Sequence, residues 1–316
     1  MTGTGSVVVI ATGGTIASRR DEDGASRPVV AGGGLLAGME PAAPVRVVDV
    51  MAHDSATLTL SHMQRISDAV GKVVSDPDTR GVVILHGTDS LEETALLLAL
   101  QHGGSDRRIV VTGAQFTFDD PEPDGPANIE AAIRFAADGP PRAARRGRDA
   151  RDAVCVVFGG RVLPAWGVYK HSADTADAFR VAGPDLAVPP SEPTPVDGVR
   201  IDIVALPPGA DALHIRASAA AGAHGIVLQA LGSGNSTAEV VAAVRECVAS
   251  GIPVVVSSRV PQGALAPSYG GGGGGRDLAE AGAVHSSTLR PGQARILLAA
   301  LVARGAEAAE VRAAFG

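Results

Sequence analysis

Three short segments of the chain carry side chains that could supply a nucleophile, a carboxylate and a base. Thr12 places a hydroxyl directly after the apolar run 7–11, next to two glycines that let a ligand approach the backbone closely. Thr88 and Asp89 place a hydroxyl and a carboxylate directly after a second apolar run. Lys170 adds an amine, a group that a buried site can turn into a general base.

The composition singles out Lys170. Only two of the 27 basic residues are lysines, Lys72 and Lys170, and all the others are arginines. Arginine does not deprotonate in proteins, whereas lysine can, so a retained lysine fits a role in proton transfer. A solvated surface charge is the alternative interpretation of a single lysine. For Thr12, the alternative is a glycine-rich turn with a capping threonine.

The elements that must position these residues are short, continuous apolar runs rich in Val and Ile. Continuous runs, rather than alternating ones, predict strands that are buried on both faces of a parallel sheet. In such a sheet, ligands bind beyond the carboxyl ends of the strands. The predicted strands are 7–11, 45–50, 82–85, 109–111, 153–158, 201–206, 225–228 and 253–256.

Helical stretches alternate with these strands, which predicts an α/β fold with right-handed crossovers. Ser90 and Glu93 have the spacing of a capping box, and Ser236 and Glu239 repeat it before a second apolar segment. If Ser90 caps its helix, Thr88 and Asp89 are left for another role. Further helices are predicted at 128–137 and 293–302.

A proline-rich stretch divides the chain. Residues 188–195 contain four prolines and suit an extended connector. We therefore expect a larger N-terminal parallel-sheet domain with flanking helices at 1–190 and a linker at 191–196. A smaller C-terminal α/β domain is expected at 197–316.

Composition excludes several classes of protein. A net charge of −7 argues against non-specific nucleic-acid binding, which needs a basic face. Two isolated cysteines exclude disulfide scaffolds and zinc ribbons, and the histidines lack metal-ligand spacing. No apolar run is long enough to span a membrane, and the N-terminus lacks the basic region of a secretory signal. We therefore expect a cytoplasmic protein without a metal.

The two threonine-bearing segments resemble the signature motifs of the bacterial-type L-asparaginase/glutaminase family. They are Thr12-Gly-Gly-Thr15 and His86-Gly-Thr-Asp-Ser-Leu-Glu-Glu-Thr94. The resemblance continues across nearly the whole chain, in the family's order and at about its spacings. The other matching segments are Asp54-Ser55, 111–115, 124–128, the Lys170 segment, 232–235, 257–261 and 288–291.

The resemblance implies hydrolysis of L-asparagine, and possibly L-glutamine, without a metal or other cofactor. It also implies a homodimer or homotetramer with its sites near a subunit interface. Thr12 corresponds to the family's nucleophile, and Thr88, Asp89 and Lys170 correspond to its Thr–Asp–Lys group. A threonine hydroxyl needs a base or strong positioning to attack an amide. Attack by Thr88, or directly by water, stays open as an alternative to Thr12.

The resemblance also implies a set of binding residues. Ser55 corresponds to the residue that binds the substrate α-carboxylate, and Asp89 to the one that binds the α-ammonium. Ala114 corresponds to a position whose backbone carbonyl meets the substrate amide. Asp54 and Gly87 adjoin these residues and complete the predicted substrate-binding set. Asn235 corresponds to a residue near the partner subunit's site, and Tyr269 is a candidate to reach in from the adjoining glycine loop.

The chain departs from the family's pattern in several places. Many relatives carry a tyrosine on a flap that corresponds to 18–30, and a partner-subunit glutamate at the position of the glycine run 270–275. Neither is present here, so what activates Thr12 is an open question. Ala56, Thr57 and Trp166 replace residues that are polar, acidic or basic in relatives.

Other functions remain to be weighed against an asparaginase. A broader glutaminase-asparaginase and the amidase subunit of a tRNA amidotransferase are alternatives within enzymes, although the latter needs an RNA-handling partner or domain. A catalytically weakened amino-acid binder is an alternative outside enzymes. The retention of two threonine hydroxyls with Asp89 and Lys170 argues against a binder, which needs no base.

Overall fold

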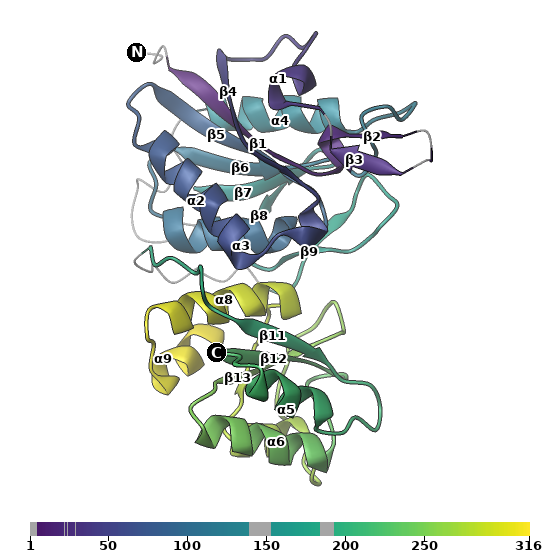
Figure 1. Ribbon diagram of the computed structural model, residues 1–316, viewed down its shortest axis with the longest axis vertical. Helices are drawn as coiled ribbons and strands as arrows, with labels where there is room; N and C mark the ends of the chain where they lie inside the picture. Colours follow the sequence, from purple (N-terminus) through teal and green to yellow (C-terminus); the bar gives the residue numbers. More distant parts are fainter. Residues whose placement is uncertain (1–4, 22, 24, 29, 139–152, 184–192) are drawn as a thin grey trace. The chain divides into compact units, whose positions relative to one another are not determined.

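The computed structural model describes residues 5–21, 23, 25–28, 30–138, 153–183 and 193–316. They form two compact units (Figure 1). Among the described residues, the first unit takes those up to Val181 together with Pro193, and the second takes Ala182, Gly183 and Thr194–Gly316. Each unit is a sheet of mainly parallel strands flanked by helices, which confirms the predicted α/β class. The end of the expected N-terminal domain and the start of the expected linker lie outside the described residues.

The first unit is built on a six-stranded sheet in the order β4–β1–β5–β6–β7–β8. The five strands from β4 to β7 are parallel and coincide with predicted apolar runs, whereas β8 is an antiparallel edge strand that was not predicted. The strands are β1 (Ser6–Gly13), β4 (Val45–His53), β5 (Thr79–Leu85), β6 (Arg108–Thr112), β7 (Val154–Phe158) and β8 (Arg161–Pro164).

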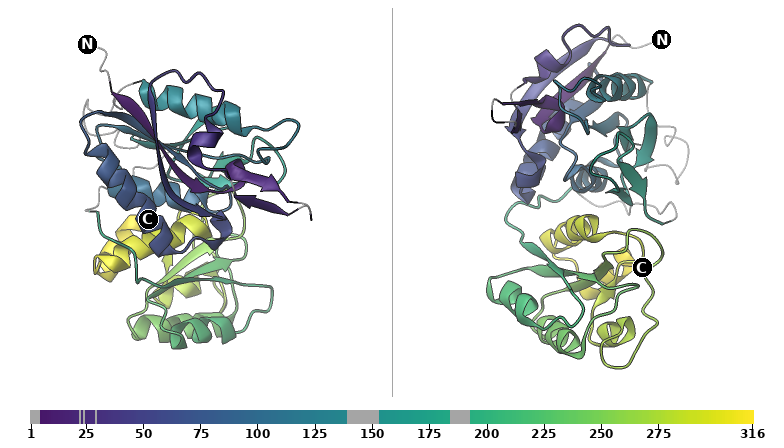
Figure 2. Two further views of the ribbon diagram at one scale, coloured as in Figure 1. Left: turned by 45° about the horizontal axis from the view of Figure 1, so that its top comes forward. Right: turned by 90° about the vertical axis from the view of Figure 1, so that its right-hand side faces the viewer.

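Helices cover both faces of this sheet (Figure 2). Val8 and Ile10 of β1 pack in one core with α2 (Leu60–Val74) and α3 (Leu91–His102). Their neighbours Val7 and Val9 face a second core, which includes α4 (Gly125–Ala137) and the short α1 (Gly32–Leu35). Because successive side chains of a strand point to opposite faces, burial on both faces requires the continuous apolar runs seen in the sequence.

Two small antiparallel ribbons accompany the main sheet. The strands β2 (Ser18–Arg20) and β3 (Ser26–Pro28) form one antiparallel ribbon. The strands β9 (Val168–Lys170) and β10 (Phe179–Val181) form the other ribbon, with Lys170 opposite Phe179. Phe179 packs edge-on against Phe158 of β7, with ring centroids 5.0 Å apart, and so anchors the ribbon in the core.

The second unit is built on a four-stranded parallel sheet in the order β11–β12–β13–β14. The helices α5 (Leu213–Ala220), α6 (Ala238–Ala249) and α7 (Gly275–Glu280) share one core with the sheet, and α8 (Pro291–Ala303) packs on its other face (Figure 1). The helix α9 (Ala308–Phe315) lies against β14. The strands are β11 (Ile201–Ala205), β12 (Gly225–Ala230), β13 (Val254–Ser258) and β14 (Val284–His285).

The two predicted capping boxes are wrong. Ser90 precedes α3, but its hydroxyl donates to the Ser55 carbonyl at 2.7 Å instead of accepting from the first turn of the helix. At α6 the cap is Thr237, whose Oγ1 accepts from the Val240 amide at 3.3 Å. The hydroxyl of Ser236 donates to the Gly273 carbonyl instead. In both cases the serine hydroxyl donates to a backbone carbonyl of a distant segment, although the local sequence predicts that it caps the helix.

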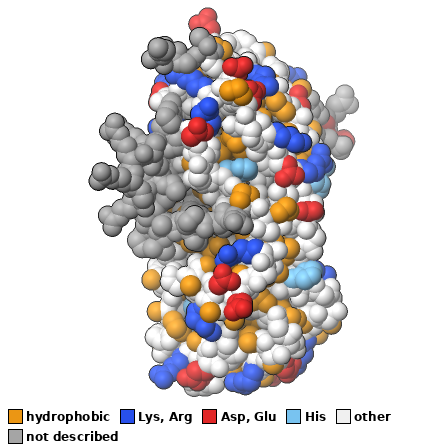
Figure 3. Space-filling view, turned by 90° about the vertical axis from the view of Figure 1, so that its left-hand side faces the viewer, with side chains coloured by type: hydrophobic (Ala, Val, Ile, Leu, Met, Phe, Trp, Pro, Cys, Tyr) orange, Lys and Arg blue, Asp and Glu red, His pale blue; other side chains and the backbone are white. Residues whose placement is uncertain are grey.

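Charges of both signs are interspersed over the described surface of each unit on the face drawn in Figure 3. Surface pairs such as Arg46–Asp76 and Arg216–Glu246 keep cations next to carboxylates. None of the described helices is long and apolar enough to cross a membrane.

Candidate active site

The carboxyl ends of four neighbouring strands bring the predicted site residues to one edge of the six-stranded sheet. Thr12 lies near the end of β1, Ser55 follows β4, Thr88 follows β5 and Ala114 follows β6. These strands are adjacent and parallel, so the segments that leave them at this edge lie side by side. The segments that carry these residues therefore share one edge of the sheet.

Glycines let the loops of this edge touch backbone to backbone. Gly14 has a φ of +83°, and a Cβ placed on it would lie 2.3 Å from the Cα of Gly87. A Cβ placed on Gly87 would lie 2.5 Å from the Ser55 hydroxyl oxygen. Only glycine fits at either position without moving its neighbours. The loops after β1, β4 and β5 are therefore in direct contact.

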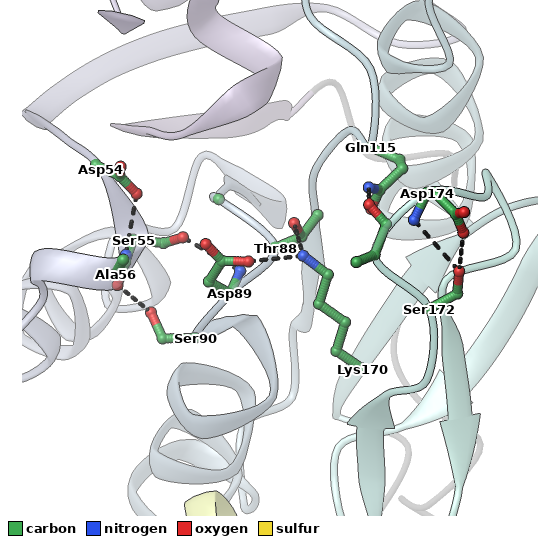
Figure 4. Close-up of polar contacts among 12 residues, drawn as sticks. Asp54, Ser55, Ala56, Thr88, Asp89, Ser90, Gln115, Lys170, Ser172 and Asp174 are labelled. Carbon is green, nitrogen blue, oxygen red and sulfur yellow. Dashed lines mark hydrogen bonds and ion pairs between the residues drawn. The ribbon is translucent and has the colours of Figure 1, made fainter. Parts of the chain in front are cut away.

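Lys170 bridges the side chains of Thr88 and Asp89 (Figure 4). Its Nζ donates to Thr88 Oγ1 at 2.8 Å and to Asp89 Oδ1 at 2.6 Å. Thr88 is buried, whereas the side chain of Lys170 is 20% exposed and that of Asp89 is 57% exposed. The amine is thus held between an enclosed hydroxyl and a carboxylate that can still reach a ligand. Lys170 is not an isolated surface charge.

Thr12 has a different partner. Its side chain is buried, and its hydroxyl donates to the Leu85 carbonyl, at the end of β5, at 2.8 Å. Thr12 belongs to β1, and the short helical turn that follows begins after Gly14 without a side-chain cap. The alternative interpretation of Thr12 as a capping residue is therefore wrong.

The turn after β4 is fastened to the turn after β5. Ser55 Oγ accepts from the Asp89 amide at 3.2 Å, and the Ser55 carbonyl accepts from the Ser90 hydroxyl at 2.7 Å (Figure 4). Asp54 is exposed, and its carboxylate accepts from the Ala56 amide at 3.0 Å, which caps the helical turn Ser55–Thr57. Ser55 and Asp89 therefore lie side by side.

His86 is a supporting residue whose role the sequence analysis missed. Its ring is completely buried, and burial lowers the pKa of His86 to about 4. In the neutral ring, Nδ1–H donates to the Gly87 carbonyl at 2.7 Å and Nε2 accepts from the Thr94 hydroxyl at 2.9 Å. The ring therefore fixes the peptide of Gly87 against α3. The motif contains His86 and Thr94, but nothing in it indicates their contact.

Glu92 is a second residue that the sequence analysis missed. It lies in the first turn of α3, and its carboxylate accepts a hydrogen bond from the backbone amide of Lys170. Burial raises the pKa of Glu92 to about 7, an effect that the hydrogen bond from Lys170 partly offsets. The helix that follows Thr88 and Asp89 is thereby connected to the strand that carries their lysine.

The loop after β6 is closed by Asp124. Its carboxylate accepts from the amides of Gln115, at 3.0 Å and 3.1 Å, and of Phe116, at 3.0 Å. Asn128 also donates to this carboxylate, at 3.1 Å. This closed loop holds Ala114, which is buried at the end of β6. The side chain of Gln115 donates to the Ala173 carbonyl, just beyond Lys170 (Figure 4).

Asn235 and Tyr269 lie in the second unit. The side-chain oxygen of Asn235 accepts from the Gly275 amide at 3.3 Å, at the end of the glycine run. Asp277 binds the same run, because its carboxylate accepts from the amides of Gly272 and Gly274 at 2.8 Å each. Tyr269 is 63% exposed. The roles assigned to Asn235 and Tyr269 by resemblance stay predictions.

Among the described residues, no group of three or more His, Cys, Asp or Glu side chains could hold a metal ion. Neither cysteine forms a disulfide, and both are buried, Cys155 in β7 and Cys247 in α6. The polar groups gathered at the sheet edge are instead hydroxyls, carboxylates and one amine. Such a set suits acyl transfer by proton movement and hydrogen bonding.

Comparison with known families matches almost the whole chain. Residues 6–188 match the family described as asparaginase, N-terminal, and residues 200–315 match the glutaminase/asparaginase C-terminal domain. The chain belongs to the asparaginase family. The enzyme is therefore an amidohydrolase, in agreement with the resemblance of its motifs.

Individual relatives carry two kinds of name. A probable L-asparaginase of Deinococcus radiodurans is 34% identical over 333 residues, covering 98% of this chain and 96% of that protein. A glutamyl-tRNA(Gln) amidotransferase subunit of Methanopyrus kandleri is 32% identical over 285 residues, covering 80% of this chain and 61% of that protein. The thermostable L-asparaginase from Thermococcus kodakarensis shares the fold, with a TM-score of 0.79 at 22% identity over 98% of this chain and 96% of that chain.

Proposed function

We propose that this amidohydrolase is an L-asparaginase, which hydrolyses L-asparagine to L-aspartate and ammonia. The observation that carries the proposal is the placement of Lys170 between Thr88 and Asp89, with its Nζ 2.8 Å and 2.6 Å from their oxygens. A hydroxyl next to an amine and a carboxylate can relay a proton. Full-length similarity to a probable L-asparaginase supports the choice of substrate.

Five residues would form the substrate site, three by contacting the substrate and two by supporting them. Asp89, more than half exposed, would accept the α-ammonium, and Ser55, whose hydroxyl lies beside the Asp89 amide, would donate to the α-carboxylate. The Ala114 carbonyl would accept from the side-chain amide. Gly87 lets its turn pack directly against Ser55, and Asp54 shapes the turn that presents Ser55.

In the proposed reaction, Thr12 Oγ gives up its proton to the Thr88–Lys170 pair and attacks the side-chain amide carbon, which forms a tetrahedral intermediate. The pair passes the proton to the amide nitrogen. The C–N bond then breaks, ammonia leaves and an ester of Thr12 remains. The same pair would activate a water molecule that cleaves the ester and releases L-aspartate. Backbone amides at the strand ends would stabilise the developing oxyanion.

Two alternatives follow from particular observations. Thr88 could attack instead of Thr12, because Thr88 is the threonine in contact with Lys170. The relative named as a glutamyl-tRNA(Gln) amidotransferase subunit is a reason to test glutamine as well, although this chain covers only 61% of that protein. A glutaminase-asparaginase of broader specificity is the second candidate function.

The test is ammonia release from L-asparagine and L-glutamine, measured from about 1 μM to about 30 mM substrate to bracket common KM values. Thr88→Ala serves as the inactive control. Release from asparagine that this control abolishes supports the proposal. Saturable asparagine binding without release would contradict it and favour the amino-acid binder, and equal turnover of both amides would favour the broader enzyme.

We also propose a cytoplasmic homodimer or homotetramer in which Asn235 and Tyr269 act near a neighbouring subunit's site. Support comes from the resemblance of the motifs and, for the compartment, from two buried cysteines that form no disulfide. Sedimentation of the purified enzyme would test the assembly. A monomer with full activity would contradict it.

A further inference from the structure

The strand that carries Lys170 is separate from the sheet that carries its partners. β9 pairs with β10 in a two-stranded ribbon, whereas Thr88 and Asp89 follow β5 of the six-stranded sheet. No strand ladder therefore sets the position of Lys170 relative to Thr88 within the described residues. Other contacts must do so, because Lys170 has to place its Nζ within hydrogen-bond reach of two oxygens.

Glu92 makes such a contact. It lies three residues after Asp89, in the first turn of α3, and accepts the backbone amide of Lys170. The lysine thus contacts one short segment twice, through Nζ at Thr88 and Asp89 and through its backbone at Glu92. Together, these contacts fix the position of the β9–β10 ribbon relative to the turn after β5.

We propose that Glu92 is a positioning residue that holds the Lys170 backbone so that Nζ reaches Thr88 and Asp89. The proposal deepens the function proposed above, because it rests on Lys170 as the proton carrier. Gln115 makes a comparable contact beyond the strand, at the Ala173 carbonyl. Glu92 acts on the lysine's own peptide, so its loss displaces the amine most directly.

The charge of Glu92 adds a second consequence. Burial raises the pKa of Glu92 to about 7; the adjacent Glu93 also raises it, and Lys170 lowers it. An ionised carboxylate accepts a hydrogen bond more strongly than a protonated one does. The hydrogen bond from the Lys170 amide to Glu92 therefore strengthens as pH rises through about 7.

Three variants test the role. Glu92→Ala removes the acceptor, and Glu92→Gln keeps an oxygen acceptor that cannot ionise. Glu130→Gln is a matched control, because Glu130 is an exposed helical glutamate of α4 that pairs with Arg134. We expect E92A to lower kcat for L-asparagine by about 30-fold with little change in KM, since small misplacements of a catalytic group cost that much. E92Q should restore most of kcat, and E130Q should match the wild type.

The pH profile separates positioning from a merely structural role. The kcat/KM of the wild type and of E130Q should rise as pH increases through about 7, and E92Q should lose this rise. If E92A does not fold, the difference between the pH profiles of the wild type and E92Q tests the proposal. An E92Q profile identical to that of the wild type, or an E92A enzyme with unchanged kcat, would overturn it.

A measurement without turnover keeps this proposal distinct from the function. In a Lys72→Arg background, Lys170 is the single lysine, so lysine labelled with ¹³C at Cε gives one NMR signal. We expect E92A to shift or broaden that signal, and E92Q and E130Q to leave it in place. If the wild type releases no ammonia, the proposed function fails. The NMR signal of Lys170 then tests the positioning role of Glu92 by itself. A signal unmoved by E92A then refutes the positioning role.

Discussion

The loops that leave β1 and β5 place the same residue type at one sheet edge, yet they give it opposite hydrogen-bond roles. Thr12 donates its hydroxyl proton to a backbone carbonyl, at Leu85. Thr88 Oγ1 accepts a hydrogen bond from the amine of Lys170. A hydroxyl that donates keeps its lone pairs for attack, whereas one that accepts from an amine has a lone pair engaged.

The two threonines can therefore play different chemical roles because their hydrogen-bond partners differ, although the residue type is the same. Thr12 has an available oxygen, but the Leu85 carbonyl cannot accept its proton permanently. Thr88 has the amine and carboxylate that can relay a proton. The contrast favours Thr12 as the attacking residue and Thr88 as the relay, and each of the following measurements tests that division.

The largest effect is expected from removing either hydroxyl. Thr12→Val and Thr88→Val keep the branched shape and should each lower kcat by about a thousandfold or more, as for residues that act as a unit. Thr112→Val is the matched control, because Thr112 is also buried and donates to a carbonyl, that of Val157, at 2.6 Å. Steady-state kinetics decide. An active T12V enzyme with an inactive T88V enzyme would reverse the assignment.

Lys170→Arg changes only the relay and leaves Thr12 untouched. Arginine keeps the positive charge but does not deprotonate in proteins, so we expect a loss in kcat of about a hundredfold, with asparagine binding retained. Lys72→Arg, at an exposed position of α2, should leave kcat unchanged. Full activity of K170R would show that the lysine supplies charge alone.

A smaller effect is expected at the neighbouring turn after β4. Ser55→Ala removes the hydroxyl beside the Asp89 amide and should raise KM by about tenfold, the cost of one hydrogen bond to a charged group. The value of kcat should change little, because Ser55 contacts neither threonine hydroxyl among the hydrogen bonds of the described residues. A fall in kcat with unchanged KM would place Ser55 in the relay instead.

The smallest effect concerns the pH dependence of stability. Folding raises the pKa of Glu92 from 4.5 to about 7, so the folded state binds its proton more tightly than the unfolded state does. The stability of the wild type relative to E92Q should therefore fall as pH rises through this window. We expect a loss of about 1–2 kcal/mol, less than the full shift implies because Glu92 is partly exposed. Urea unfolding of both proteins at pH 4.5 and pH 8 measures it, and a constant difference would contradict the burial of the carboxyl.

The sequence predicts some parts of this molecule well for an identifiable reason. The strands around Ile10 and Ile84 are buried on both faces, and burial of that kind leaves a continuous apolar pattern. The ribbon that carries Lys170 was missed because three-residue strands leave no period to detect. Ser90 was misassigned because the Ser55 carbonyl, 35 residues away, competes with the helix for its hydroxyl.

The candidate site also contains residues that the sequence could predict and one that it could not. Thr88, Asp89 and Lys170 could be predicted from their motif and composition, and the contacts between them agree with that prediction. Glu92 could not, because its partner is a backbone amide 78 residues along the chain, and any carboxylate in a first helical turn has a local explanation. Sequence patterns indicate which residues gather at an edge; they do not indicate which residues hold the others in place.

The contact between Gly14 and Gly87 limits how this enzyme can be altered by selection. Any side chain at either position collides with neighbouring atoms, so random libraries at these two codons will return mainly non-functional protein. Productive variation must come from residues whose side chains have room, such as the exposed Ala56. Directed evolution toward another amide is therefore best concentrated there, with the glycine codons left unvaried.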